Sequence, residues 1–298
     1  MPTEVPTTGL RPEGAMRTDT GAVRPHNEDF VAYIAPPRGD PAAARGSLML
    51  VADGMGGHAA GEVASELAVT TVRRVFYQLP GSVPQVLAAA FMAANRAILD
   101  WSESKPECRG MGTTCTAIAI RDDKAWLAHI GDSRAYHWRD GVITQLSDDQ
   151  TLVAQMVREG KLTPEEAQNS PISNVILQAL GSHAEIAPVV WSEPIQLAAG
   201  DVLLLCSDGL TGVVSDATIA QQIERLPPDE ACEALIRTAL AAGAPDNVSV
   251  GVFRMVSETE RPAAVQSDNP GGTTRQVGPV PNERTSERPT QTRKMNIV

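Results

Sequence analysis

The sequence predicts an α+β fold in which two antiparallel β-sheets pack face to face, with helices on the outer faces. Short apolar runs bounded by turn residues recur along the chain and indicate buried strands. Longer segments with apolar residues at helical spacing follow these runs in groups, and do not alternate with them as a parallel sheet requires. A sandwich of two antiparallel sheets satisfies this order of elements.

The apolar run 48–52 organises the amino-terminal half, because it ends at Asp53-Gly54 and leads through a glycine-rich loop into a helix. That helix carries an apolar stripe that includes Val63 and Phe76, and a second amphipathic helix follows it. The elements expected here are strands over 15–20, 30–34 and 48–52, and helices over 62–79 and 84–102.

The middle of the chain is predicted to form an antiparallel meander, in which successive strands are neighbours. Asp140-Gly141 is a strong signal for a two-residue hairpin turn. The strands expected here are 113–120, 125–130, 135–139 and 142–146. The last elements are a strand over 202–206, helices over 216–225 and 229–242, and a strand over 248–255.

Residues 147–181 form a polar segment of helical pattern between these two groups of strands. Thr163-Pro164-Glu165-Glu166 has the form of a capping box, with proline at the first helical position. Few large apolar residues precede Ile172, so the segment is expected to be a mobile flap beside the core.

Length and composition define the domain organisation. The chain has 298 residues, of which 42% are hydrophobic, enough to bury the core of one large domain or two small ones. Residues 1–13 and 258–298 carry little to bury and are rich in Pro and Thr, so we expect a disordered leader and tail. The folded domain is expected over 14–257, with the flap at about 147–181.

Composition also indicates the cellular compartment and excludes some classes of partner. No apolar run approaches the roughly 20 residues of a membrane span, so a cytoplasmic protein without membrane contact is expected. The four cysteines lack the spacing of a zinc or redox motif and are expected to be reduced and buried. The net charge of -11 argues against nucleic acid as a partner.

Acidic residues stand at the ends of several predicted strands. Asp53, Asp132 and Asp208 each follow a strand, and Asp246 begins one. Because neighbouring antiparallel strands run in opposite directions, such positions can meet at one edge of a sheet. Clustered carboxylates raise one another's pKa unless a cation lies between them.

Oxygen ligands of this kind favour the hard dications Mg²⁺ and Mn²⁺, whereas the five histidines show no zinc-ligand spacing. Two dications about 3.5–4 Å apart can activate a water molecule and hold a phosphoryl group. The acids therefore predict direct, metal-dependent hydrolysis of a phosphate ester.

Five short segments fix this interpretation more closely. They are Arg24-Pro-His-Asn-Glu-Asp29, Ala52-Asp-Gly-Met-Gly-Gly-His58, Gly131-Asp-Ser-Arg134, Ser207-Asp-Gly-Leu210 and Pro245-Asp-Asn-Val-Ser249. In this order they resemble the signatures of metal-dependent protein Ser/Thr phosphatases, the protein phosphatase 2C family in its bacterial form. The resemblance covers about residues 15–256.

The resemblance implies a four-layer αββα sandwich with a flap, and a centre of two Mn²⁺ or Mg²⁺ ions. On the family's pattern Asp53 bridges both ions and the Gly54 carbonyl binds one of them. Asp208 and Asp246 ligate the other ion, and Asp132 holds a third ion more weakly.

The same pattern assigns the catalytic residues. Arg24 would take the substrate phosphate, for which its fork of N–H donors is suited. Glu28 and Asp29 would orient metal-bound water. The chain departs from the eukaryotic members of the family at Met55, where they have a histidine that is proposed as the general acid. His58 lies nearby in the sequence.

The implied function is a protein serine/threonine phosphatase that reverses a bacterial Ser/Thr kinase, with phosphoproteins and a cognate kinase as partners and a monomeric state. One alternative is a phosphatase of a phosphoprotein that regulates transcription, such as an anti-sigma antagonist. Another is a catalytically silent phosphoprotein-binding module, although such a protein has no need to keep the acids together. The acidic balance disfavours a two-metal nuclease.

Overall fold

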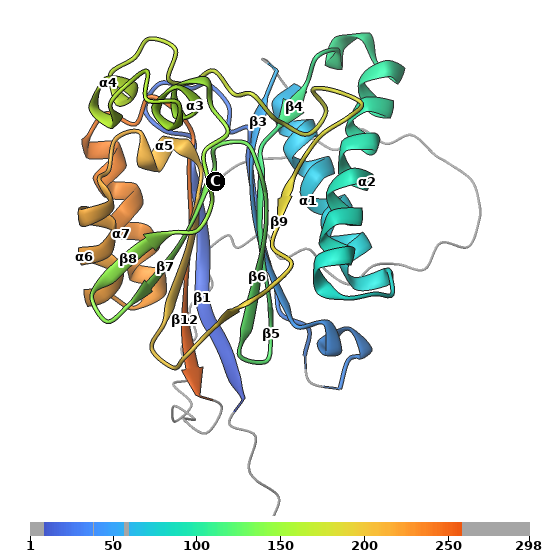
Figure 1. Ribbon diagram of the computed structural model, residues 1–298, viewed down its shortest axis with the longest axis vertical. Helices are drawn as coiled ribbons and strands as arrows, with labels where there is room; N and C mark the ends of the chain where they lie inside the picture. The colour runs from blue at the N-terminus through green and yellow to red at the C-terminus, as the bar shows by residue number, and fades with distance from the viewer. Residues whose placement is uncertain (1–8, 38, 57–59, 258–298) are drawn as a thin grey trace, which may run out of the picture.

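The computed structural model describes residues 9–37, 39–56 and 60–257, and it has the predicted sandwich architecture. Two antiparallel sheets lie face to face, and helices cover the outer face of each, giving four layers (Figure 1). The first sheet has five strands, in the order β1 (Leu10–Asp19), β12 (Val248–Ser257), β11 (Val202–Cys206), β7 (Arg134–Arg139) and β8 (Val142–Gln145).

The second sheet has seven strands. Its main path is β10 (Ile195–Gln196), β6 (Lys124–Ile130), β5 (Cys115–Arg121), β3 (Ser47–Met55) and β2 (Asp29–Ile34), with β4 (Gly112–Thr113) beside β3 and β9 (Val189–Val190) beside β6. The strands β3, β5, β11 and β12 are built mainly from apolar, β-branched and small residues, which suit a surface buried on both sides.

The helices divide between the two outer faces, as Figure 1 shows. The second sheet is covered by α1 (Ala60–Gln78) and α2 (Val83–Ser104), and the first by α5 (Asp208–Thr211), α6 (Asp216–Arg225) and α7 (Pro228–Ala241). The flap contains α3 (Leu152–Arg158) and α4 (Pro164–Gln168), the latter with the predicted capping box. Short 3-10 helices span Pro41–Arg45 and Pro106–Cys108.

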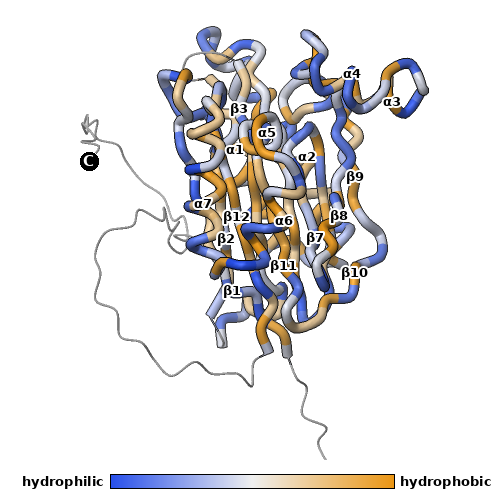
Figure 2. The backbone as a smooth tube through the Cα atoms, turned by 90° about the vertical axis from the view of Figure 1, so that its left-hand side faces the viewer, coloured by the Kyte–Doolittle hydropathy of each residue, from blue (hydrophilic) through white to orange (hydrophobic). Residues whose placement is uncertain are grey.

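Buried apolar side chains fill the space between the sheets and the space under each helix pair. Figure 2 shows these residues concentrated along the strands in the middle of the molecule. Phe253 of β12 is fully buried between the sheets, and its ring lies 4.7 Å from the ring of Tyr33 on β2. This aromatic pair therefore links one sheet to the other.

The predicted meander is wrong at one point, the connection between β6 and β7. The pairs β5–β6 and β7–β8 form as expected, and Asp140 and Gly141 adopt the positive φ angles of the predicted hairpin turn. However, β7 pairs with β11 in the first sheet, while β6 belongs to the second. The chain therefore crosses from one sheet to the other at residues 131–133.

The first strand also begins earlier than predicted. Residues 10–13, which we assigned to the leader, pair with residues 254–257 of β12. Main-chain hydrogen bonds to a neighbouring strand do not depend on apolar side chains, so the polar composition of this segment hid its strand. The rest of the leader and the tail lie outside the described residues.

Two composition-based expectations concern the cysteines and the membrane. All four cysteines are buried and none forms a disulfide, as predicted. Within the described ranges, no helix is both long enough and apolar enough to span a bilayer.

The inter-sheet core predicts a large stability loss when Phe253 is truncated. Phe253→Ala should lower the free energy of unfolding by about 3–5 kcal/mol, because it leaves a cavity between the sheets. Val142→Ala, at a site that is 64% exposed, should change it by less than about 0.5 kcal/mol. Urea denaturation of both variants measures the difference, and equal effects would contradict the packing described.

Candidate metal centre

The predicted acids meet at one end of the sandwich, where both sheets end. Asp29 begins β2 and lies opposite Asp53 of β3 in the strand register. On the other sheet Asp208 follows β11, and Asp246 precedes β12, its antiparallel neighbour. Asp132 lies in the crossover between the sheets. Each sheet therefore supplies part of the cluster.

Backbone contacts fix Asp53 at the end of β3. Its N–H donates to Thr114 Oγ1 over 3.0 Å, and its carbonyl accepts from Thr113 Oγ1 over 2.8 Å. The next residue, Gly54, lies so close to the first turn of α1 that an added Cβ would fall 2.1 Å from the Gly61 carbonyl oxygen. Glycine is needed here because the helix and the strand approach at the carboxylate.

Hydroxyl and amide side chains hold the acids of the other sheet. Ser207 Oγ donates to Asp29 Oδ2 over 2.8 Å, which joins β11 to β2 across the sandwich. Asn247 Oδ1 accepts from the Glu28 N–H, while its Nδ2 donates to the carbonyls of Thr20 and His26. Asn247 thereby fastens the loop that carries the predicted phosphate-binding residues to the start of β12.

Burial and like charge raise the pKa values of these carboxyl groups. Burial is the largest cause for Asp29, whose pKa is raised to about 7, and for Asp132, whose pKa is raised to about 8. The pKa of Asp53 is raised well above its ordinary value by burial and by its neighbours Asp29, Asp208 and Asp132. The cluster therefore retains protons near neutral pH when no cation is bound.

The carboxyl groups of Asp53 and Asp208 interact: the contact raises the pKa of Asp53 and opposes the rise that burial produces in the pKa of Asp208. Several buried carboxylate oxygens of the cluster have no hydrogen-bond partner in the protein. Oδ1 of Asp29, of Asp132 and of Asp208 each lacks a hydrogen-bond donor. Carboxylates with free lone pairs are what Mn²⁺ and Mg²⁺ bind, so the residues fit the predicted ions.

The cluster is not a closed cage in this conformation. Across the described part of the chain, no three His, Cys, Asp or Glu side chains are arranged as a ready metal site. Asp246 is instead paired with Arg24, whose Nη2 donates to Asp246 Oδ2 over 2.7 Å. The guanidinium is held by a predicted ligand, and this hydrogen bond raises the pKa of Arg24.

Glu28 stands beside this pair. Burial is the main cause that raises its pKa, and the charge of Arg24 opposes that shift. An added Cβ on Gly61 would lie 2.7 Å from Glu28 Cδ, so this carboxylate lies against the start of α1. All the predicted site residues thus gather at one end of the sandwich, whereas His58 lies outside the described residues.

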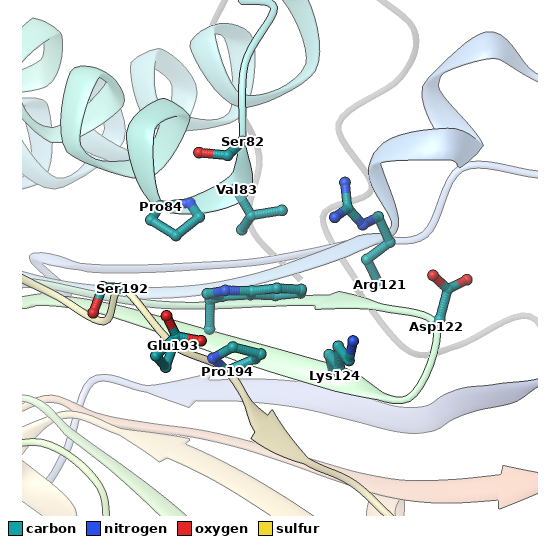
Figure 3. Close-up of a pocket in the computed structure, with 10 residues that line it drawn as sticks. Ser82, Val83, Pro84, Arg121, Asp122, Lys124, Ser192, Glu193 and Pro194 are labelled. Atoms are coloured by element: carbon teal, nitrogen blue, oxygen red, sulfur yellow. The ribbon is translucent and has the colours of Figure 1, made fainter.

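A cavity of about 370 Å³ lies elsewhere, against the turn that joins β5 to β6 (Figure 3). Arg121 and Lys124 line it together with Val83 and Pro84 at the start of α2. This turn joins the ends of β5 and β6 opposite to the crossover that carries Asp132. The cavity is therefore separate from the carboxylate cluster.

The family model described as protein phosphatase 2C matches residues 37–246, well over half of the chain. The chain belongs to the protein phosphatase 2C family. The match includes Asp53, Asp132, Asp208 and Asp246, and begins after Arg24.

Individual members of the protein phosphatase 2C family agree with this. The chain is 44% identical over 243 residues to the serine/threonine protein phosphatase PstP of Mycobacterium tuberculosis, covering 81% of this chain but only 45% of that protein. It is 38% identical to the protein phosphatase PhpP of Streptococcus pneumoniae over 83% of this chain and 98% of that one. The chain thus spans less than half the length of the mycobacterial relative.

Solved structures of the family show the same fold. A crystal structure of the catalytic domain of PstP in complex with two manganese ions superposes with a TM-score of 0.72 at 42% identity. It covers 83% of this chain and 100% of the domain. The serine/threonine phosphatase of S. agalactiae matches with a TM-score of 0.74 at 33% identity, over 82% of this chain and 99% of that one.

Sequence reasoning missed the residues that support the phosphatase 2C acids. These are Thr113, Thr114, Ser207 and Asn247, whose contacts are described above. Ser207 and Asn247 stand next to predicted ligands in the sequence, which was the available signal. Their hydrogen-bond partners lie in residues 20–29, far away in the sequence. No local pattern identifies such long-range hydrogen bonds.

The raised pKa values predict how the stability of the metal-free protein depends on pH. Asp132 titrates near 3.8 when unfolded and near 8 when folded, so between these values the folded state binds more protons. The free energy of unfolding is therefore greatest below about pH 4 for this group and should fall as the pH rises towards 8. Asp132→Asn should reduce this fall by more than about 1.4 kcal/mol, the value of one pKa unit.

Urea denaturation in EDTA at several pH values measures this dependence. Asp122→Asn is the matched control, because Asp122 lies exposed in the β5–β6 turn and asparagine tolerates its positive φ of 58°. An Asp132→Asn profile that falls as steeply as that of the wild type would contradict the assignment.

Proposed function

We propose that this protein is a metal-dependent protein serine/threonine phosphatase that hydrolyses phosphoserine and phosphothreonine in proteins. The observation that carries the proposal is the meeting of Asp29, Asp53, Asp132, Asp208 and Asp246 at the seam of the two sheets, with buried oxygens that lack donors. Family membership and the phosphatase relatives support the same activity.

Asp53 and Gly54 would hold one dication, Asp53, Asp208 and Asp246 would hold the second, and Asp132 a weaker third. The manganese ions in the PstP catalytic domain support this choice of metal. When bound, the ions supply a nucleophilic water at neutral pH and neutralise charge on the phosphoryl group.

The side chains around the cluster orient the reacting groups and move protons. Asp29 is held through Oδ2 by Ser207, so its Oδ1 can accept a proton from water. Glu28 is placed by the Asn247 bond to its backbone and orients water beside Asp29.

Arg24 is the cation that faces the substrate side of the cluster, and its side chain is half-exposed. Its guanidinium can donate in parallel to two phosphoryl oxygens. In the conformation described it donates to Asp246 instead. Asp246 would be shared between Arg24 and a bound dication, so ligation of the ion by Asp246 would leave Arg24 free for the substrate phosphate.

We propose a bacterial Ser/Thr kinase as the enzyme opposed, because PstP, Stp and PhpP relatives carry Ser/Thr or protein phosphatase names. The phosphatase of a transcription regulator remains the alternative within the same chemistry. The clustered acids disfavour a silent binding module, since such a protein gains nothing from burying charges that repel each other.

The activity is tested with purified protein, Mn²⁺ and a phosphothreonine peptide. Hydrolysis should release inorganic phosphate, and this release should stop when EDTA is added. Asp208→Asn should lower kcat/KM at least about a hundredfold, because the change removes a charged ligand of the cation. Asp122→Asn, in the distant turn, should keep wild-type rates. Hydrolysis that survives both EDTA and Asp208→Asn would refute the proposal.

The role of Arg24 gives a separate prediction. Arg24→Ala should raise KM for the phosphopeptide about tenfold with a smaller change in kcat, because ground-state phosphate binding is lost. Arg24→Lys should recover only part of this, since lysine cannot donate in a fork. Arg225→Ala, on the outer helix α6, is the control. Steady-state kinetics that show an unchanged KM for Arg24→Ala would exclude phosphate binding by Arg24.

A further inference from the structure

The base of the flap is held by the residues on either side of Asp132. Three consecutive flap residues are involved. His129 Nε2 lies 3.1 Å from the carbonyl of Asp148. Arg134 donates to both carboxylate oxygens of Asp149, with Nη2 2.6 Å from Oδ2.

Gln150 makes the most direct of these contacts. Its side-chain Oε1 accepts from the Gly131 N–H over 2.9 Å, and its own N–H donates to the Gly131 carbonyl over 2.9 Å. Gly131 is buried and immediately precedes Asp132. Its φ of 107° and the presence of Thr114 2.6 Å from a Cβ built on it allow only glycine. Gln150 therefore holds, through two hydrogen bonds to Gly131, the turn that positions Asp132.

Main-chain hydrogen bonds connect the outer part of the flap to the same segment. The Leu177 N–H donates to the Gln150 carbonyl over 2.8 Å, and the Leu152 N–H donates to the Val175 carbonyl over 2.8 Å. At the exit of the flap, Leu180 and Thr113 exchange two main-chain hydrogen bonds of 2.9 and 3.0 Å. Thr113 also binds the carbonyl of Asp53.

We propose that Gln150 is a positioning residue that makes the flap and the Asp132 turn move as one unit. The entry of the flap is tied to Asp132 through Gln150, and its exit is tied to Asp53 through Thr113. A change at the carboxylates, such as binding of the dication, is thereby transmitted to residues 150–177. This link rests on the proposed function only for the identity of the ion.

Hydrogen exchange of individual amides tests the link in the whole chain. Gln150→Met keeps the length of the side chain but removes the acceptor of the buried Gly131 N–H, whereas Gln150→Glu keeps an acceptor oxygen. In the metal-free protein, Gln150→Met should speed exchange at the Gly131 and Leu177 amides about tenfold, because an unpaired buried donor favours local opening. Gln150→Glu should restore slow exchange.

Addition of Mn²⁺ tests the transmission. In the wild type Mn²⁺ should slow exchange at the Leu177 amide, and Gln150→Met should reduce that protection about tenfold. Gln196→Met is the matched control, because it removes a single hydrogen bond to the Asp123 carbonyl at the opposite end of the sandwich. It should leave the Leu177 amide as in the wild type.

The possible outcomes distinguish a failure of the proposed Gln150 link from a failure of the proposed phosphatase activity. Gln150 is only partly buried, so Gln150→Met should fold, and circular dichroism checks this. Exchange at Leu177 that is the same in Gln150→Met and the wild type overturns the proposal, as does an equal effect of Gln196→Met. A protein that binds no Mn²⁺ and hydrolyses no phosphopeptide would refute the proposed function, while the metal-free comparison would still decide the link.

Discussion

The repulsion between buried carboxylates at the seam of the sandwich is the constraint on which the rest of the structure depends. Burial raises the pKa values of Asp29, Asp53 and Asp208, and the charge of Asp208 raises those of Asp29 and Asp53 further, so the metal-free site keeps protons that a surface aspartate would lose. Such a cluster is unfavourable unless donors and a cation compensate it. Ser207 donates to the carboxylate of Asp29, whereas Thr113 and Thr114 bind only the main chain of Asp53, so most of the compensation must come from a cation.

The two sheets hold these groups in place because neither carries the whole site. Asp29 and Asp53 belong to one sheet, and Asp208 and Asp246 flank strands of the other. Their separation is therefore set by the packing between the sheets, including the contact of Phe253 with Tyr33. Close-packed interiors deform little, so a core of large buried side chains fixes the positions of ligands on the facing sheets. The same core that stabilises the fold thus positions the site.

The sequence predicted most of this from local patterns. The apolar runs before Asp53 and Asp208 and the Asp140-Gly141 turn identified strands and their ends, and the family signatures assigned the ligands. It did not predict the crossover at Asp132, because nothing local in the sequences of β6 and β7 says which sheet each strand joins. Nor did it predict the bond between Arg24 and Asp246, 222 positions apart, since such pairs form only when the fold brings them together.

That bond shows how the site accommodates its charge before a cation arrives. Arg24 neutralises Asp246, the acid nearest the surface of the cluster, while the buried acids retain protons. A dication must displace both the guanidinium and the protons, so its affinity should rise with pH over the range in which Asp29 and Asp132 titrate. On the proposed function, the guanidinium would then be free to bind the substrate phosphate. Because linkage is reciprocal, a phosphate group that engages Arg24 strengthens cation binding by the same factor.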